Sequence, residues 1–241
     1  MRRYVPLLIL VASLVGWNSL SSAQVPGPSG PTLVELCKQH PTDKCPFHHN
    51  YVVFYEALFS PLRNQKLRLL EIGVLEGHSL RLWEAYFPSA QIFGVDLESK
   101  AQYDTPRIKT LVADQGQRAD LAKVIAATGG DLDIVLDDGG HTMEQQQISF
   151  GTLFAALKSG GLYILEDVHT SFPNIHPGYG VEPDGENSTY SMIDRLVRTG
   201  RVRSKYLADA ENDYLSENIS HCTYFWRSNR FHSDFLACWK K

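Results

Sequence analysis

The residues best able to do chemistry in this sequence are acids that follow apolar runs. Asp138 comes just after the run 132–136, and Glu166 and Asp167 come directly after the run 162–165. If these runs are adjacent parallel strands, about 4.8 Å apart, the three carboxylates converge at one edge of a sheet. Crowded carboxylates repel one another unless they are protonated or hold a cation, and hard oxygen ligands favour Mg²⁺, with Mn²⁺ or Ca²⁺ as alternatives. We therefore predict a divalent-metal site at Asp138, Glu166 and Asp167; the competing interpretation is that single acids cap helices or form solvated turns.

His141 is predicted to act as a general base. It follows Asp138 by three residues across two glycines, so that both side chains can face one pocket. A neutral imidazole in that position can take a proton from a substrate hydroxyl. The alternative is an exposed polar histidine, and the neighbouring acids favour the catalytic interpretation.

A glycine turn upstream predicts a nucleoside-binding site. The apolar run 67–72 meets a turn at Gly73, an amphipathic segment 79–86 follows, and a second apolar run ends on Asp96. In a doubly wound fold the glycine lets the backbone approach a ligand, and the acid accepts hydrogen bonds from ribose hydroxyls. The spacing is Gly-x-x-x-Gly rather than the Gly-x-Gly-x-x-Gly of dinucleotide sites, which disfavours a nicotinamide oxidoreductase.

Strand-like and helix-like segments alternate along the chain, which predicts an α/β fold. We expect a doubly wound, Rossmann-like arrangement with a seven-stranded, mostly parallel sheet and an antiparallel C-terminal strand. The predicted strands are 67–72, 91–95, 109–113, 132–136, 162–165, 219–225 and 234–239, and the predicted helices are 32–38, 51–59, 79–86, 118–128, 143–158 and 191–199. Residues 168–190, rich in Pro, Gly and His, are expected to form a loop over the site.

The N-terminal residues predict export. Residues 1–23 combine a basic start, an apolar core and small residues before Gln24, as in a cleaved secretory signal peptide. The apolar core of about 14 residues is short of the roughly 20 needed to span a bilayer, so an uncleaved anchor is disfavoured and no stable membrane span is expected. Residues 24–31 form a Pro/Gly linker, and 32–241 are expected to form a single domain. The predicted location is secreted or the secretory lumen, or the periplasm in a bacterium.

The four cysteines agree with an oxidising compartment. A secreted chain with an even number of cysteines usually pairs them, and three connectivities are available. We favour Cys37–Cys45, which closes a short loop, and Cys222–Cys238, which joins two neighbouring antiparallel strands. A zinc site is the alternative, and no Cys-x-x-Cys spacing supports it.

Length and charge narrow the class of protein. At 241 residues with 43% hydrophobic residues, the chain can bury a full-sized core. Its net charge is −4 and no basic cluster is present, which argues against nucleic acid as a partner. An oligomer remains compatible with this composition.

The order of the motifs resembles one enzyme family. The Glu71-x-Gly73-x-x-x-Gly77 turn resembles motif I of class I S-adenosylmethionine (SAM) methyltransferases. The whole series resembles the macrolide and tetracenomycin sugar O-methyltransferases, which include macrocin and mycinamicin VI O-methyltransferases. The segments that carry this resemblance are Thr42-Asp43-Lys44, His48-His49, Phe59-Ser60-Pro61-Leu62-Arg63, Leu70-Glu71-Ile72-Gly73-Val74, Asp114-Gln115, Asp137-Asp138-Gly139-Gly140-His141 and Glu166-Asp167.

The resemblance implies a reaction and a role for each site residue. It implies SAM-dependent and Mg²⁺-dependent (or Mn²⁺-dependent) methylation of a sugar hydroxyl, with Asp138, Glu166 and Asp167 holding the metal and His141 as the base. Glu71 and Gly73 are expected at the methionine end of SAM, Asp96 at the ribose, and Asp114 with Gln115 at the adenine. The full set assigned to cofactor binding is Glu71, Gly73, Gly77, Ser79, Asp96, Asp114, Gln115 and Asp137.

Two other functions stay open from the sequence. A metal-dependent phenol or catechol O-methyltransferase uses the same fold and a similar carboxylate site. A catalytically inactive, secreted glycan-binding homologue would bind saccharide without SAM, and the intact set of acids argues against it. The predicted acceptor is therefore a small-molecule or glycan hydroxyl.

Overall fold

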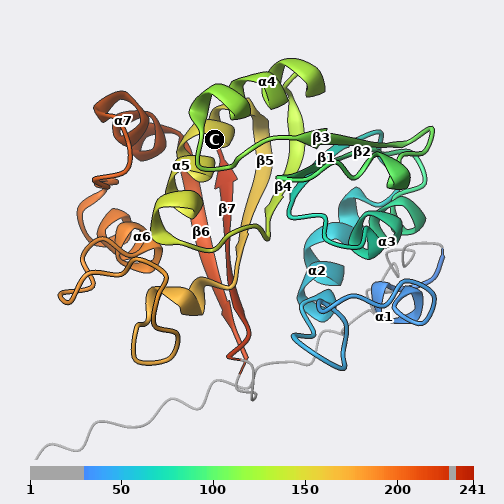
Figure 1. The fold of residues 1–241 in the computed structure, drawn as a ribbon, viewed down its shortest axis with the longest axis horizontal. Coiled ribbons are helices and arrows are strands. Elements are labelled where there is room, and N and C mark those ends of the chain that lie inside the picture. The colour runs from blue at the N-terminus through green and yellow to red at the C-terminus, as the bar shows by residue number, and fades with distance from the viewer. Residues whose placement is uncertain (1–29, 228–231) are drawn as a thin grey trace, which may run out of the picture.

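The computed structural model describes residues 30–227 and 232–241, and its seven strands form one sheet in the order β3-β2-β1-β4-β5-β7-β6 (Figure 1). Strands β1 to β5 are parallel, and β7 is antiparallel to both of its neighbours. The predicted doubly wound, mostly parallel sheet is confirmed. The strands are β1 (Arg68–Ile72), β2 (Gln91–Asp96), β3 (Ile108–Val112), β4 (Leu132–Asp137), β5 (Leu157–Glu166), β6 (Ile219–Trp226) and β7 (Asp234–Lys240). The predicted signal peptide at 1–23 and most of the linker lie outside the described residues.

Helices cover both faces of the sheet, as Figure 1 shows. They are α1 (Leu33–Leu36), α2 (Val52–Phe59), α3 (His78–Tyr86), α4 (Arg118–Thr128), α5 (Met143–Leu153), α6 (Thr189–Thr199) and α7 (Asp209–Asn218). Successive residues of a strand point to opposite faces. Leu69 of β1 accordingly packs into the core under α1, α2 and α3, whereas Leu70 packs into the core under α4, α5, α6 and α7.

Two elements differ from the sequence-based prediction. The predicted helix 143–158 is too long, because α5 ends at Leu153 and β5 already begins at Leu157. Leu157 is buried beside Leu132, and the register shifts before Ile134 pairs with Leu162. The glycine pair at 160–161 therefore lies in an irregular part of the strand and does not end a helix.

Helix α7 was not predicted at all. Its sequence is largely polar, and it buries only Asn212 and Leu215. A helix with so few buried positions has no apolar repeat for sequence reasoning to detect.

Both disulfides have the predicted pairing. Cys37 and Cys45 have Cα atoms 5.9 Å apart, and Cys222 faces Cys238 directly across the β6–β7 ladder. The first disulfide ties the segment that leads into α2, and the second ties the last two strands together. Within residues 30–227 and 232–241, no helix is long and apolar enough to cross a membrane.

Candidate active site

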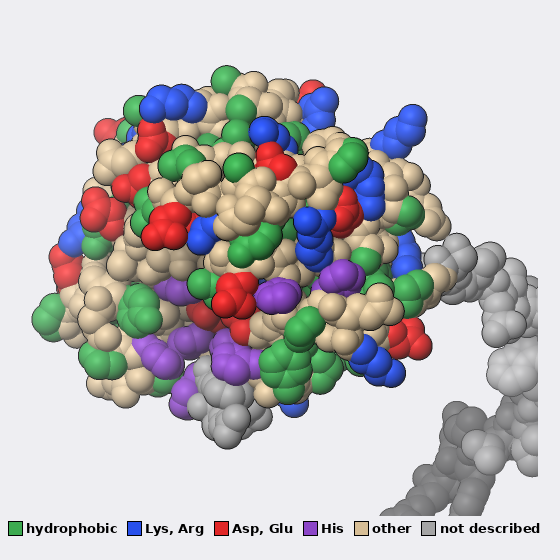
Figure 2. Space-filling model, turned by 45° about the vertical axis from the view of Figure 1, so that its right-hand side comes forward, with side chains coloured by type: hydrophobic (Ala, Val, Ile, Leu, Met, Phe, Trp, Pro, Cys, Tyr) green, Lys and Arg blue, Asp and Glu red, His purple; other side chains and the backbone are tan. Residues whose placement is uncertain are grey.

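A cleft of about 920 Å³ opens at the carboxyl ends of the parallel strands, where ligands bind in open α/β sheets. Its walls come from the turn after β1, the ends of β2, β3 and β4, the segment 41–48 and Asp167. Figure 2 shows one face of the molecule, on which histidine side chains gather beside acidic ones. The predicted loop 168–190 contributes no residue to the described walls. It packs instead against the start of α5, where the amide of Met143 donates to the carbonyl of Tyr179.

The turn after β1 shapes the floor of the cleft. Gly73 has a φ of +89°, and a Cβ atom added to it would lie 2.1 Å from the carbonyl oxygen of Asp138. Only glycine at this position therefore allows the backbone after β1 to approach the backbone after β4 so closely. Gly77 has a φ of +71° and packs against the ring of Tyr103, so it shapes the start of α3 without lining the cleft.

Glu71 lies beneath the cleft rather than in its wall. It is fully buried, and one of its carboxylate oxygens accepts hydrogen bonds from the Ser79 hydroxyl at 2.8 Å and the Trp83 indole at 3.1 Å. Its other oxygen, Oε1, has no hydrogen bond among the described residues. Burial raises the pKa of Glu71 to about 7. Both Glu71 and Ser79 were predicted to contact the cofactor, but only Ser79 lines the cleft. Glu71 lies behind it and holds the Ser79 hydroxyl.

Asp96, at the end of β2, lines the cleft, and its role as a ribose ligand stays a prediction. Its Oδ2 accepts the amide protons of Val74 and Leu75 at 3.1 and 3.2 Å, and its Oδ1 accepts that of Glu98 at 3.0 Å. These bonds join the β1 turn to the end of β2 and fix the carboxylate. Leu97, which also lines the cleft, is 66% exposed and offers an apolar surface next to this acid.

Asp114 and Gln115, which follow β3, also line the cleft, and their predicted place at the adenine stays a prediction. Gln115 accepts the amide proton of Gly140 at 2.6 Å and donates to Asp137 at 3.1 Å. Asp137 is 1% exposed and also accepts hydrogen bonds from Ser149 and from Tyr163. The sequence predicted that Asp137 contacts the cofactor directly. In the structure its carboxylate is buried behind the wall of the cleft and hydrogen-bonds to protein side chains instead.

Asp138, His141 and Asp167 converge as a group that could hold a metal ion. One ligand atom from each lies within 4.8 Å of the other two. The Nε2 atom of His141 is 3.6 Å from Oδ1 of Asp138 and 3.7 Å from Oδ2 of Asp167. Burial alone would raise the pKa of Asp167, but His141, His49 and the Tyr51 hydroxyl hold that pKa below its usual value. The two carboxylate oxygens are donors that suit a divalent cation, and the imidazole nitrogen beside them is the atom that could accept a proton.

Glu166 has different partners from the two aspartates. It is 1% exposed, accepts a hydrogen bond from the Tyr55 hydroxyl at 2.7 Å, and lies 3.1 Å from the ammonium of Lys44. It therefore stands outside the close group of Asp138, His141 and Asp167, although the sequence predicted it as a third metal ligand.

Sequence reasoning missed the cation at the centre of this cluster. The Lys44 side chain is 2% exposed, and its ammonium contacts Asp138 and Glu166, with Asp43 at 3.6 Å and Glu71 at 3.9 Å. Burial would lower the pKa of Lys44, but the surrounding carboxylates raise it well above its usual value. In the sequence, only the Thr42-Asp43-Lys44 motif pointed to this lysine. Lys44 lies in a loop before the first strand, and the rule that ligands bind at the carboxyl ends of strands does not place such a residue.

The fold is that of the Rossmann-like methyltransferases, and comparisons with known proteins identify similar chains. No family model matches the sequence. Mycinamicin VI 2''-O-methyltransferase from Micromonospora griseorubida is 39% identical over 177 residues, which is 70% of this chain and 43% of that protein. The 8-demethyl-8-alpha-L-rhamnosyl tetracenomycin-C 2'-O-methyltransferase of Streptomyces olivaceus is 37% identical over 183 residues, covering 73% and 47%.

A solved structure gives the same result. The MycE methyltransferase of the mycinamycin biosynthetic pathway, in complex with Mg, SAH (S-adenosylhomocysteine) and mycinamycin VI, has a TM-score of 0.73 and 30% identity, covering 89% of this chain and 56% of that one. The resemblance deduced from the motifs is confirmed, because the curated homologues are sugar O-methyltransferases. The chain spans about half the length of the curated relatives it matches.

Proposed function

We propose that this protein is a SAM-dependent, divalent-metal-dependent O-methyltransferase that acts on a hydroxyl of a sugar or glycoside. The observation that carries the proposal is that the group of Asp138, His141 and Asp167 opens into the same cleft as Gly73 and Asp96. A methyl donor and a coordinated hydroxyl can therefore meet in one space. The solved relative that contains both Mg and SAH supports the pairing of the two ligands.

The donor end of the cleft suits a nucleoside with an amino-acid tail. Asp96 ends β2 with a carboxylate that is already fixed by backbone amides, so it can accept ribose hydroxyls with little reorganisation. Asp114 and Gln115 face the region expected for the base. Gly73 allows close backbone approach, and Ser79 lies at the start of α3, where the amino-acid tail is expected.

The acceptor end of the cleft suits deprotonation of a hydroxyl. Asp138 and Asp167 each direct one oxygen toward His141 and would hold the cation through these oxygens. A divalent ion bound there would lower the pKa of a coordinating hydroxyl and fix its position. His141 Nε2 would accept the proton as the oxygen attacks the methyl group of SAM in line with the S–CH₃ bond. The sulfonium sulfur leaves as a neutral thioether, so the charges balance.

Acceptor profiling tests the proposal. Purified chain, labelled SAM and Mg²⁺ are incubated with deoxysugar glycosides and, separately, with catechols, each with and without EDTA. We expect label in glycosides, and its loss with EDTA. Methylation of catechols without glycosides would support the phenol or catechol enzyme instead, and saccharide binding without any transfer would support an inactive glycan-binding homologue.

We also propose that the protein is exported. The two disulfides support this, because such bonds persist in oxidising compartments. Mass mapping of unreduced protein from the secretory route should give Cys37 linked to Cys45, and a mature N-terminus at Gln24. Free thiols and an intact Met1 in that protein would contradict export.

A further inference from the structure

Strand β6 lies at one end of the sheet, and the outer side of its backbone is unpaired (Figure 1). Its partner in the sheet is β7. Within residues 30–227 and 232–241, no other element forms a hydrogen bond with the backbone of Cys222, Tyr224 or Trp226. A strand with a free row of N–H and C=O groups is a template on which another strand can pair.

The pairing of β6 with β7 shows which backbone groups face outward. In an antiparallel ladder, hydrogen-bonded pairs with Cα atoms about 5.5 Å apart alternate with non-hydrogen-bonded pairs about 4.5 Å apart. Cys222 and Cys238 have Cα atoms 4.1 Å apart and therefore form a non-hydrogen-bonded pair. The amide of Arg227 donates to the carbonyl of Ser233, which agrees with this alternation. The residues whose N–H and C=O groups point away from β7 are consequently Cys222, Tyr224 and Trp226.

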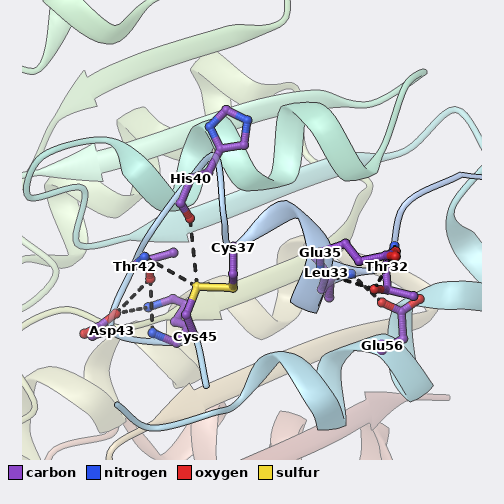
Figure 3. The surroundings of a disulfide bond; sticks show 10 residues. Thr32, Leu33, Glu35, Cys37, His40, Thr42, Asp43, Cys45 and Glu56 are labelled. Atoms are coloured by element: carbon purple, nitrogen blue, oxygen red, sulfur yellow. Dashed lines mark hydrogen bonds and ion pairs between the residues drawn. A yellow bond between two sulfur atoms is a disulfide. The ribbon is translucent and has the colours of Figure 1, made fainter. Parts of the chain in front are cut away.

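A disulfide holds this strand in place. The Cys37–Cys45 disulfide closes a loop beside α1 (Figure 3), whereas Cys222–Cys238 crosses the ladder and joins β6 to β7. The covalent link keeps β6 extended and in register with β7. The outward groups of β6 therefore have a fixed spacing before any partner arrives, which lowers the entropy cost of pairing.

The opposite end of the sheet is protected against pairing, and β6 is not. At β3, the amide of Thr110 donates to the carboxylate of Asp104 at 2.8 Å, and Lys109 forms an ion pair with the same acid. An occupied amide and a charged side chain are devices that keep an edge strand from pairing. By contrast, the sequence of β6, ISHCTYFW, contains no Asp, Glu, Lys, Arg or Pro and is rich in residues that favour strands.

We propose that β6 is a dimer interface, on which the β6 strand of a second copy of this chain pairs in antiparallel orientation. A two-fold axis through Tyr224 places this residue opposite the partner's Tyr224, and Cys222 opposite the partner's Trp226. The two sheets then form one continuous sheet, and the symmetry closes the assembly at two chains. A strand that pairs with itself brings identical side chains close together, so the absence of charge in β6 favours a second copy as the partner.

The side chains beside the edge add apolar surface to this interface. Trp226 is 60% exposed and Tyr224 is 36% exposed. Alternate residues of a strand share a face, so both lie on the face of Cys222. On that face a pocket of about 140 Å³ is lined by Tyr190, Ile193, Asp194, Val197, Cys222, Tyr224 and Leu236. In the proposed register the partner's Trp226 lies beside Cys222 and covers the mouth of this pocket.

The test is sedimentation equilibrium of the full, disulfide-intact chain, without SAM or metal. A concentration series up to about 100 µM populates even a micromolar dimer, so the wild-type chain should reach twice the monomer mass. Tyr224→Pro should raise the dimer Kd at least about tenfold, because two hydrogen bonds between the chains are lost. Proline is tolerated on an edge strand where its missing N–H would face outward, so the fold should persist.

A second pair of variants tests the side chains. Trp226→Lys places a charge in the interface and should also raise the dimer Kd at least about tenfold. Val112→Lys is the matched control, because Val112 is 64% exposed on β3 at the other end of the sheet. It should change the dimer Kd by less than about twofold. Thermal unfolding checks that each variant is folded, and Trp226→Lys decides the question alone if Tyr224→Pro does not fold.

Amide hydrogen exchange locates the interface. The outward amides of Tyr224 and Trp226 should exchange at least about tenfold more slowly in the dimer than in dilute monomer, because pairing gives them acceptors. A wild-type chain that stays monomeric throughout the series overturns the inference, even if its edge binds an extended segment of another protein. A dimer that both folded variants leave unchanged overturns it as well, because the chains then meet elsewhere. Either result leaves the proposed catalytic function standing.

Discussion

Replacing Gly73 by alanine tests how the β1 turn positions the acidic group. The added Cβ would lie 2.1 Å from the carbonyl oxygen of Asp138 and 2.8 Å from its carbonyl carbon, and both are backbone atoms that cannot rotate away. A left-handed φ costs a non-glycine residue roughly 1–2 kcal/mol. Forcing the two backbone segments apart adds roughly 1–3 kcal/mol. We therefore expect Gly73→Ala to destabilise the protein by about 2–5 kcal/mol in total.

Gly130→Ala is the matched control, because Gly130 has a φ of +63° and open space around its missing Cβ. It should cost only the conformational part, about 1–2 kcal/mol. With roughly 2–4 °C of Tm per kcal/mol for a domain of this size, Gly73→Ala should lower Tm by roughly 4–20 °C and the control by roughly 2–8 °C. Scanning calorimetry of the oxidised protein measures both. Equal losses of Tm in the two variants would refute the close approach of the β1 turn to Asp138.

Three further results are expected. Burial lowers the pKa of His49 to about 4, so the folded state favours the neutral imidazole. The free energy of unfolding should therefore fall as the pH drops from 6.5 toward 4. Urea unfolding across that range should show a smaller fall for His49→Gln than for the wild type. The double variant Cys37→Ser/Cys45→Ser should lose about 2–4 kcal/mol of stability in the same assay, and an unchanged midpoint would contradict a structural role for the disulfide. His141→Ala should lower the rate of methyl transfer by roughly 10²–10⁴-fold at saturating SAM and Mg²⁺, while SAM and the metal ion still bind. A loss of Mn²⁺ binding in this variant would instead show that His141 coordinates the metal and is not the base.

The parts of the fold that the sequence predicts are those with a strong apolar repeat. Strands β1, β2 and β4 of the parallel sheet are almost fully buried, so their apolar runs and the acids that follow them mark both the sheet and its functional edge. Helix α4 was predicted with the observed bounds, because its apolar positions repeat on one face and Gly129 ends it in a left-handed conformation. Helix α7 and the start of β5 carry no such signal, since few of their residues are buried or the chain is irregular there.

The candidate site, like the fold, could be predicted only in part. Asp138, His141 and Asp167 follow from their place at strand ends, where a parallel sheet brings residues distant in sequence together. The partners that fix them are not predictable in this way. Lys44 and Tyr51 come from the segment before the first strand, and only the folded chain brings them against these acids. The role of Asp137 was misjudged because adjacent acids at a strand end point to opposite faces, one into the cleft and one behind it.

The most direct test of the central claim is calorimetric titration of the purified chain with SAH, with and without Mg²⁺, alongside Asp96→Ala. The account predicts saturable binding of SAH by the wild-type chain. It predicts that Asp96→Ala weakens this binding by about 1–3 kcal/mol, because the buried ribose hydroxyls lose their acceptor. Absence of SAH binding by the folded wild-type chain, or wild-type affinity in Asp96→Ala, would contradict a methyl-donor site in this cleft.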